Sequence, residues 1–483
     1  MSQSLRKMIS LATVAMILTV LLAACGGGAT PVPATPTTGG GAATEPTATT
    51  GAAAAEATPT TGAAAAEATA TTGGTAGGPL ELPSQCSAVE INYWNPFTGP
   101  DGPFMQQIVD NFNTDHPNIK VNNNTNQAIG GQYDTQLDTA QASGQLPNVA
   151  IINEDAIATR AFRNTLRPID DFVDQVGIQG SDFPEVAWNT GEVAGKRYGI
   201  PLSFVVMTMF YNEDLMNEAG ITSVPTNREE FEAAAEAMTK DGKNGYLLTT
   251  AFPVQQIFQQ LLHQFGGQEF SDDGTEATWN SDAGVQALTW MKETNDKFGQ
   301  ANLEVDAELN AFKAGNVGMI WNGIWQIPNV TGEAVAFAGK AAPPPQIGDE
   351  PATWAGGPFL TMPVQPSEDE CKDTASIIFI KYVLDNSLEW AKAGNVPAMN
   401  TVRNSAEFQA LPHAVLAPAV ENPVFPPSIP GIGSAFAPLG EAVSAVIAGT
   451  QTDIKAALDD AAQRANAILE ENRQEFGDAP AGP

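Results

Sequence analysis

The side chains in this sequence that could do chemistry are mainly aromatic rings and short polar groups. Candidate ring faces are Trp94, Phe97, Phe252, Trp325 and Trp354. Candidate polar groups are Asn95, Asp155, Gln255 and Gln256, and Gly357 lies in a Gly-rich turn beside one of the rings. Aromatic walls with a few polar groups are the usual form of a small-ligand site. Each residue could equally be structural, and the two glutamines are the weakest candidates because a solvated helix face would carry the same pair.

Signatures of catalysis are missing from the sequence. It contains no GxSxG, HExxH, phosphate-loop or CxxC motif. His116, His263 and His413 are far apart and show no paired spacing. We therefore expect a binding protein with no cofactor and no metal. Carboxylates are plentiful, so a glycosidase pair stays an alternative, as does a surface adhesin.

The segment 312–329 is predicted to position the Trp325 ring. Its apolar run at 317–321 is short and bounded by turn signals, which predicts a buried strand. Asn322 then ends the strand, and we expect it to cap a short helix that carries Trp325. Ligands bind at the carboxyl edge of open α/β sheets. We therefore expect Trp321 in the core and Trp325 at a ligand.

The first part of the folded region alternates between strand and helix patterns. Strands are predicted at 89–94, 119–121 and 149–152, with helices at 104–112 and 133–143. This order predicts parallel pairing with right-handed crossovers. Asn95 and Asp155 follow two of these strands and should share one edge of the sheet.

Later segments predict a second sheet. The apolar run at 198–211 is longer than most strands, so we expect it to leave one sheet and enter another. A capping box at Thr226 and Glu229 starts a predicted helix. Further predicted helices are 258–265, 376–384 and 453–469, and 395–401 is predicted as a loop.

The N-terminus has the pattern of an export signal. Arg6 and Lys7 precede an apolar run at 8–22 that is short for a membrane span. The following Leu22-Ala23-Ala24-Cys25 resembles the bacterial lipobox, which implies a lipid on Cys25. More than one acyl chain would hold the protein on the membrane. The alternative is an ordinary signal peptide with an incidental cysteine.

Composition separates a tether from the rest. Residues 26–83 are mostly Ala, Thr, Gly and Pro, which predicts disorder. The remaining chain of about 400 residues is too large for one ordinary core and predicts two lobes. The formal charge of −33 excludes nucleic acid as a partner and disfavours attachment to anionic lipid by charge.

Six motifs together carry a resemblance to a known family: YWNPFTGPDG (93–102), ASGQLPNVAI (142–151), YGIPLSF (198–204), YNEDLMNEAGI (211–221), GNVGMIWNGIW (315–325) and AGNVPAMNT (393–401). In this order they resemble the extracellular solute-binding proteins of ABC importers, which include maltose-type sugar binders. The resemblance implies an α/β, two-lobed periplasmic-binding-protein fold of type II with a ligand cleft between the lobes. It also implies three interlobe crossings, near 204–208, 356–360 and 396–401.

The resemblance sets the expected organisation. We expect a signal peptide at 1–24, a lipidated tether at 25–86, one lobe from 87–205 with 357–400, and another from 206–356 with 401–483. The implied function is capture of a small carbohydrate by hinge closure outside the cell, followed by delivery to the permease subunits. The implied form is a lipid-anchored monomer.

Two departures from the sugar-binding pattern bear on the ligand. Val205 stands where maltose binders have an acid, and Ala437 stands where they have a Trp. Maltose itself is therefore not the expected ligand. The alternative is glycerol phosphate or another phosphorylated polyol, for which Arg160, Arg163 and Arg403 are the candidate contacts.

A disulfide is expected between Cys86 and Cys371. With Cys25 lipidated, these two remain as an even pair in an exported chain. The family resemblance also returns the 376–384 helix, just after Cys371, to the lobe that begins near Cys86. The alternative is two separate buried thiols.

Overall fold

The computed structural model of the chain describes residues 80–477 apart from 126–131, 301–305 and 422. The predicted signal peptide, the lipid site at Cys25 and the tether up to residue 79 lie outside the described residues. Gly74–Pro483 is assigned to one compact unit. Among the described helices, none is long and apolar enough to cross a membrane.

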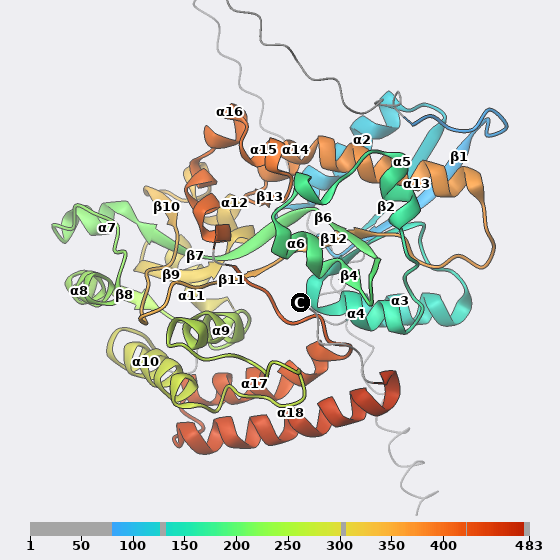
Figure 1. The fold of residues 1–483 in the computed structure, drawn as a ribbon. Helices are drawn as coiled ribbons and strands as arrows, with labels where there is room; N and C mark the ends of the chain where they lie inside the picture. Colours follow the sequence, from blue (N-terminus) through green and yellow to red (C-terminus); the bar gives the residue numbers. More distant parts are fainter. Residues whose placement is uncertain (1–79, 126–131, 301–305, 422, 478–483) are drawn as a thin grey trace, which may run out of the picture. The chain divides into compact units, whose positions relative to one another are not determined.

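Four strands from the N-terminal part of the folded chain and one later strand form a five-stranded sheet (Figure 1). Its order is β2 (Ile119–Thr125), β1 (Val89–Asn95), β3 (Val149–Asn153), β12 (Pro358–Thr361) and β6 (Gly199–Pro201). The first three strands are parallel, as the alternation of strands and helices predicts, and β12 is antiparallel to β3. Helices α2 (Gly102–Asp115) and α13 (Glu370–Asp385) pack on one face, and α3 (Gln132–Ser143) and α4 (Glu154–Phe162) pack on the other.

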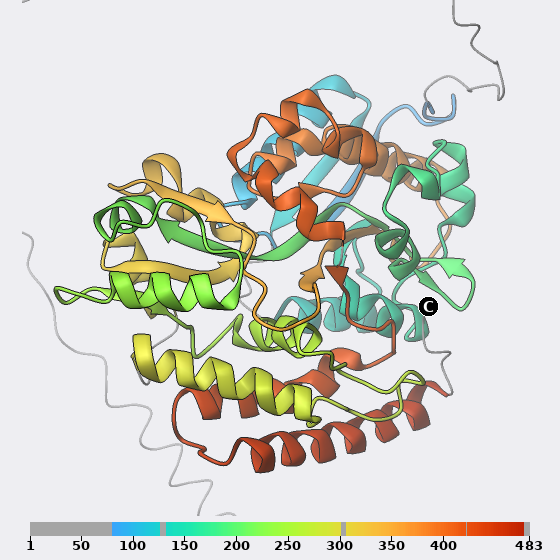
Figure 2. The ribbon, with the colours of Figure 1, turned by 60° about the vertical axis from the view of Figure 1, so that its left-hand side comes forward.

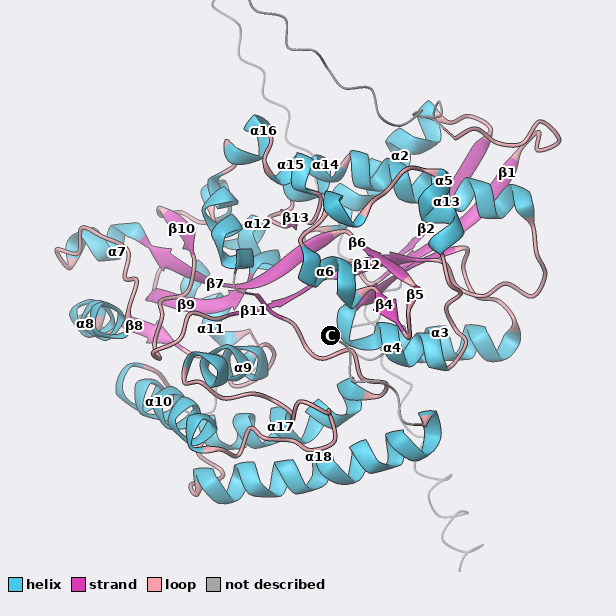
Figure 3. Ribbon diagram, in the orientation of Figure 1, coloured by secondary structure: helices cyan, strands magenta, loops and turns pink. Residues whose placement is uncertain are grey.

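A second sheet is built around the ten-residue strand β7 (Ser203–Asn212). Its path is β14 (Pro423–Val424), β11 (Thr353–Gly356), β7, β9 (Val317–Gly323) and β8 (Asn244–Leu247), while β10 (Gly339–Ala342) and β13 (Val396–Pro397) also pair with β7. Figure 3 shows these strands among the helices. Its helices include α7 (Glu213–Glu218), α8 (Arg228–Met238), α9 (Val254–Gln264), α10 (Asp282–Phe298), α11 (Ala307–Lys313) and α12 (Ile327–Val330).

The C-terminal helices α17 (Ile432–Ile447) and α18 (Ile454–Phe476) lie side by side, and both contact α10 (Figure 2). Leu439, Val443 and Leu458 from this pair are fully buried with α9 and α10 in one apolar core. Shorter helices are α5 (Asp170–Gln175), α6 (Glu185–Thr190), α14 (Ser387–Ala391), α15 (Asn400–Arg403) and α16 (Ala406–Gln409).

The apolar run at 198–211 does leave one sheet and enter the other. Its first part is β6, in the five-stranded sheet, and its second part is β7. The other two predicted crossings meet β7 directly. Val205 of β7 is the register partner of Gly356, and Phe204 is the register partner of Val396. One continuous core backs this junction and includes Ile91, Phe204 and Phe312.

Several predicted boundaries were wrong. The capping box predicted at Thr226 and Glu229 is not formed. Instead Asn227 caps α8 by accepting the Glu230 backbone N–H, and the Glu230 carboxylate accepts the backbone N–H of Thr226. Asn322 caps no helix, because β9 continues through Gly323 before a short 3-10 turn, Ile324–Gln326. The predicted loop at 395–401 contains β13 and the start of α15. Helix ends were missed because packing extends helices beyond the clearest periodicity.

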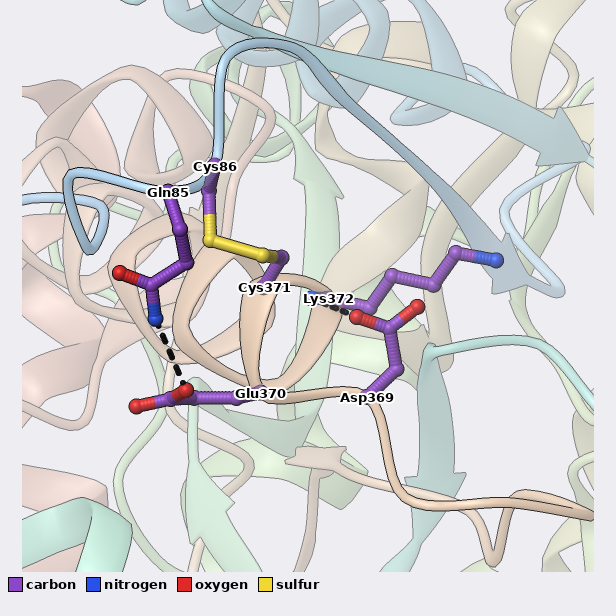
Figure 4. The surroundings of a disulfide bond; sticks show 6 residues. All are labelled: Gln85, Cys86, Asp369, Glu370, Cys371 and Lys372. Atoms are coloured by element: carbon purple, nitrogen blue, oxygen red, sulfur yellow. Dashed lines mark hydrogen bonds between the residues drawn. A yellow bond between two sulfur atoms is a disulfide. The ribbon is translucent and has the colours of Figure 1, made fainter.

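A disulfide joins Cys86 to Cys371 across 285 residues of sequence (Figure 4). Cys86 lies three residues before β1, and Cys371 lies in the first turn of α13. Beside the bond, the Gln85 side chain donates a hydrogen bond to the Glu370 carboxylate at 3.1 Å. The disulfide thereby ties the segment just before β1 to α13, and α13 itself packs on β1.

We expect Cys86→Ser to lower the free energy of unfolding. Opening so long a loop removes about 4–5 kcal/mol in the chain-entropy model, and measured losses are commonly 2–5 kcal/mol. Urea unfolding of oxidised wild-type and variant proteins measures the difference. Dithiothreitol should destabilise the wild type and leave the Cys86→Ser/Cys371→Ser protein unchanged. Equal stability of the wild type with and without reductant would contradict the prediction.

Candidate ligand-binding site

Two aromatic side chains form an accessible pair next to the second sheet. The ring of Phe252, just before α9, stacks on the ring of Trp325, just after β9, with centroids 5.5 Å apart and planes 23° apart. Phe252 is 62% exposed, the largest exposed fraction among the large hydrophobic residues described. Trp325 is half-buried. Exposed stacked rings at a strand end offer a flat apolar face to a ligand.

The position of Trp325 depends on the absence of a side chain at Gly323. A Cβ atom on Gly323 would lie 1.9 Å from the Trp325 ring. The backbone N–H of Gly323 donates to the Asn322 side-chain oxygen at 2.8 Å, which fixes the turn. The Asn322 amide nitrogen in turn donates to Glu308 at 3.3 Å.

Glu308 is a buried acid that holds the Asn322 side chain in place. It lies in α11, and both Glu308 and Asn322 are almost fully buried. Burial raises the pKa of Glu308 because desolvation disfavours the charged carboxylate. A buried carboxyl group without a hydrogen-bond partner would raise the free energy of the folded state. The hydrogen bond from Asn322 reduces this cost.

Two acidic residues begin α4 directly after β3. The Glu154 carboxylate, 7% exposed, accepts the backbone N–H of Gly357 at 2.8 Å and so joins α4 to the β11–β12 crossing. Asp155 is half-buried, and its carboxylate lies 3.5 Å from where a Cβ on Gly433 of α17 would stand. Burial raises the pKa of both groups. The charge of Asp155 further raises the pKa of Glu154, and the charge of Asp134 further raises the pKa of Asp155.

Helix α4 contacts the C-terminal helices beyond these acids. The backbone N–H of Gly431 donates to the Thr159 hydroxyl at 2.7 Å. The Arg163 guanidinium pairs with Glu475 at 3.3 Å and lies 5.4 Å from the centroid of the Phe476 ring. The first sheet's helix is thus held against α17 and α18, on the side where Asp155 faces Gly433.

The predicted site residues separate into two groups. The structure brings Asp155 against α17, stacks Phe252 on Trp325, and puts Gln255 beside α17. The Gln255 side-chain oxygen lies 2.7 Å from where a Cβ on Gly440 would stand. Gln255 therefore belongs to a packed helix face rather than to the solvated face that was the alternative.

Four other predicted site residues are buried and contact neighbouring parts of the chain. Asn95 is 1% exposed and bonds Asn123 and the Phe97 backbone, and Phe97 packs on Trp390 at 4.5 Å. Trp354 is 9% exposed in the core of the second sheet. Gly357 is buried at the crossing, where a Cβ would lie 2.2 Å from the Ser203 carbonyl oxygen. Direct ligand contact by these four residues stays a prediction.

Trp94 lies on the α3-covered face of the first sheet, opposite to Tyr93 and α2. Its neighbours there include Thr139 and Gln145. The position agrees with the strand alternation, but the sequence does not show which face of β1 a helix covers. The contact of Trp94 with the same ligand as Phe252 and Trp325 stays a prediction.

Glu154 and Glu308 are the two buried acids beside the candidate site that sequence reasoning missed. Glu154 is next to Asp155 at the predicted strand end, and this position could have identified it. Glu308 lies four residues before the buried Phe312, so it shares the apolar face of α11, and this spacing could have identified it. Among the described residues, no group of acids, histidines or cysteines could hold a metal ion.

Asn322→Ala should release Trp325 and destabilise the protein. It leaves the Gly323 N–H and Glu308 without partners, which costs about 1–3 kcal/mol for each buried unsatisfied group. Acrylamide quenching isolates the Trp325 signal when each protein is compared with its Trp325→Phe counterpart. Quenching should increase in Asn322→Ala. Glu308→Gln is the control, because its amide oxygen still accepts from Asn322. Unchanged quenching in Asn322→Ala would refute the support assigned to Asn322.

Stability should fall as the pH rises above the ordinary pKa of Glu154, 4.5. The folded-state pKa is raised, so the folded protein binds a proton that the unfolded chain has lost. The contribution is fully present below 4.5 and is lost as the pH rises through the raised value. Glu154→Gln should reduce the fall in melting temperature between about pH 5 and about pH 8. Glu185→Gln, at an exposed position, is the control. Parallel curves for wild type and Glu154→Gln would contradict this.

Comparison with known proteins identifies the family. Residues 107–417 match the profile of the bacterial extracellular solute-binding proteins. A protein of Brucella abortus is 24% identical over 249 residues, which cover 50% of this chain and 59% of the relative. The match thus spans about three fifths of that relative. A maltooligosaccharide ABC transporter solute-binding lipoprotein of Streptococcus pneumoniae is 23% identical, covering 74% of this chain and 84% of the relative.

A solved structure shows the same fold. The GacH receptor of Streptomyces glaucescens, whose structures include a complex with acarbose, superposes with a TM-score of 0.69 at 22% identity. The superposition covers 80% of this chain and 99% of the receptor. The chain therefore belongs to the bacterial extracellular solute-binding proteins and has their two-lobed fold of the maltose-binding type.

Proposed function

We propose that this protein is the solute-binding component of an ABC importer and captures a small neutral carbohydrate between its two lobes. The observation that carries the proposal is the stacked pair Phe252 and Trp325. Sugar rings present apolar C–H faces that pack on aromatic rings, and a rigid pair of rings offers a large contact area. The relative from Streptococcus pneumoniae is named for maltooligosaccharides, which supports the same ligand class.

Acidic groups at the start of α4 supply the polar half of the site. Sugar hydroxyls donate to carboxylates, and such charge-assisted hydrogen bonds are stronger than neutral ones. Asp155 is the group available for this role, because Glu154 already accepts the Gly357 N–H. Burial raises the pKa of Asp155 to about 6, so the ionised carboxylate that would accept these hydrogen bonds predominates only above that pH.

A phosphorylated ligand fits the arginines poorly. Arg160 is paired with Asp134 at 2.7 Å and with Asp138. Arg163 is paired with Glu475, and Arg403 donates to the carbonyl oxygens of Pro397 and Ala398. A phosphate would have to displace these partners and would face the Glu154 and Asp155 carboxyls.

Hinge closure is the proposed mode of capture. The crossings paired at β7 would form the hinge, between a lobe of 87–205 with 357–400 and a lobe of 206–356 with 401–483. The contacts of Thr159 and Arg163 with α17 and α18 would then stabilise the closed form. A closed lobe pair buries the sugar against Trp325 and excludes water from the carboxylate.

The N-terminal segment would place the protein at the cell surface. Export followed by lipid attachment at Cys25 would anchor the protein outside the membrane, and the 25–86 tether would let it reach the permease. It would act as a monomer and would not turn over its ligand. Incubation with an oligosaccharide panel tests this last point, because a glycosidase would release shorter products.

Maltotriose should raise the melting temperature of the full-length protein, since a ligand that binds only the folded state stabilises it. Glycerol 3-phosphate should not. Trp325→Ala should weaken maltotriose binding at least tenfold, about 1.4 kcal/mol, when measured by calorimetry. Trp94→Ala, a tryptophan on another face, is the matched control and should bind normally. Undiminished affinity in Trp325→Ala, or stabilisation by glycerol 3-phosphate alone, would overturn the proposal.

A further inference from the structure

The outer face of β1 and β2 is a polar surface on a parallel sheet. Register pairs on this face are Glu90 with Lys120, Asn92 with Asn122, and Trp94 with Asn124. The side chains of Glu90, Asn92, Lys120 and Asn124 are exposed. Parallel sheets are normally covered on both faces, and the opposite face of these strands is indeed buried against α2 and α13. The polar face therefore calls for an explanation other than packing.

Three adjoining hollows run along this face. One of about 530 Å³ lies beside the disulfide and includes Asn92, Asn122 and Lys372. A second of about 530 Å³ shares Asn92 and Lys372 with it and reaches Trp94. A third of about 290 Å³ shares Trp94 and Gln145 with the second and borders α3. We name these three hollows together the outer trough, and hollows of this size accommodate small ligands.

Amide side chains dominate the middle of the outer trough. Asn148 and Gln365 form its floor, where Asn148 accepts the Asn92 backbone N–H at 3.0 Å and Gln365 donates to the Pro147 carbonyl at 2.9 Å. These bonds fix the floor. Asn124 and Gln145 are exposed at its rim. Each amide both donates and accepts, which matches the hydroxyl groups of a sugar.

Trp94 supplies the apolar surface that amides lack. It is half-buried, and the Tyr133 hydroxyl donates to its carbonyl oxygen at 3.1 Å, which holds the backbone at this point. Its register partner is the exposed Asn124. One ring beside one exposed amide is the combination that holds a pyranose by its apolar face and its hydroxyl edge.

The charges of the outer trough favour an uncharged ligand. Its lining carboxylates are Glu90 and Asp369 and its lining cation is Lys372, all beside the disulfide. The Asn122 amide donates to Glu90 at 2.7 Å, and Asp369 caps the first turn of α13 (Figure 4). No arginine lines any of the three hollows among the described residues. Over the three hollows together an anion would meet two carboxylates and one lysine, although Lys372 is the one charged residue among those described that lines the hollow with Trp94 and Asn124.

We propose that the outer trough is a second saccharide-binding site, which takes a neutral oligosaccharide with one pyranose ring on Trp94. It is separate from the pair Phe252 and Trp325 and works whether or not that pair binds sugar. Its shallow, exposed form points to weaker binding than a closed cleft gives. A site of this kind retains a glycan chain near the protein without enclosing it.

The test uses the full-length Trp325→Ala protein, in which binding at the interlobe pair should be weakened at least tenfold. Maltohexaose, mannohexaose and xylohexaose are the neutral probes, and hexagalacturonic acid is the charged one. Saturation-transfer NMR titration measures each affinity. At least one neutral probe should bind, and adding Trp94→Ala or Asn124→Ala should weaken that binding at least tenfold. Lys120→Ala is the control on the same face and should leave the affinity unchanged.

Three results would overturn the proposal: no neutral probe binds, only hexagalacturonic acid binds, or neither Trp94→Ala nor Asn124→Ala weakens binding. Asn124 is exposed, so its substitution keeps the test decisive even if Trp94→Ala fails to fold. Maltotriose binding to Trp94→Ala with Trp325 intact reports the interlobe site separately. The failure of one site is therefore distinguishable from the failure of the other.

Discussion

The pairing of strand β7 is the constraint on which the rest of the structure depends. Each residue from Ser203 to Asn212 has a register partner, and those partners come from β9, β10, β11 and β13. A buried strand cannot leave its backbone groups unpaired without a large cost in free energy. Two other chain crossings therefore have to meet β7 where it passes between the sheets. Motion of the lobes must bend this bundle of strands and cannot take them apart.

Buried polar side chains form hydrogen bonds at the same junction. Glu154 bonds the N–H of Gly357 and Trp390 bonds the Ser203 hydroxyl at 2.9 Å, so buried polar groups cluster where the crossings lie. Their hydrogen bonds join α4 to the β11–β12 crossing and α14 to β7. Burial raises the pKa of Glu154 and so favours its neutral form at this junction, in a chain whose formal charge is already −33.

Sequence patterns predicted the elements of this fold better than the exposure of individual residues. The Asn-Gly turn after 317–321 correctly predicted a buried Trp321 and a Trp325 beyond the strand, because turn chemistry and apolar runs are local properties. Asn95, Phe97 and Trp354 were predicted at a ligand and are buried instead. Alternation gives the two faces of a strand but not which face a distant helix covers. Trp390, which covers Phe97, lies almost 300 residues further along the chain and could not be paired with it from local pattern.

The disulfide also determines how tension would enter the fold. A pull on the N-terminal chain arrives at Cys86, three residues before β1. Without the bond it would peel β1 from its neighbours one hydrogen-bond pair at a time, which is the weakest direction for a sheet. With the bond, the tension passes into α13 and through its apolar packing against β1. The strand that begins the fold is thus shielded from unzipping while the rest of the molecule moves.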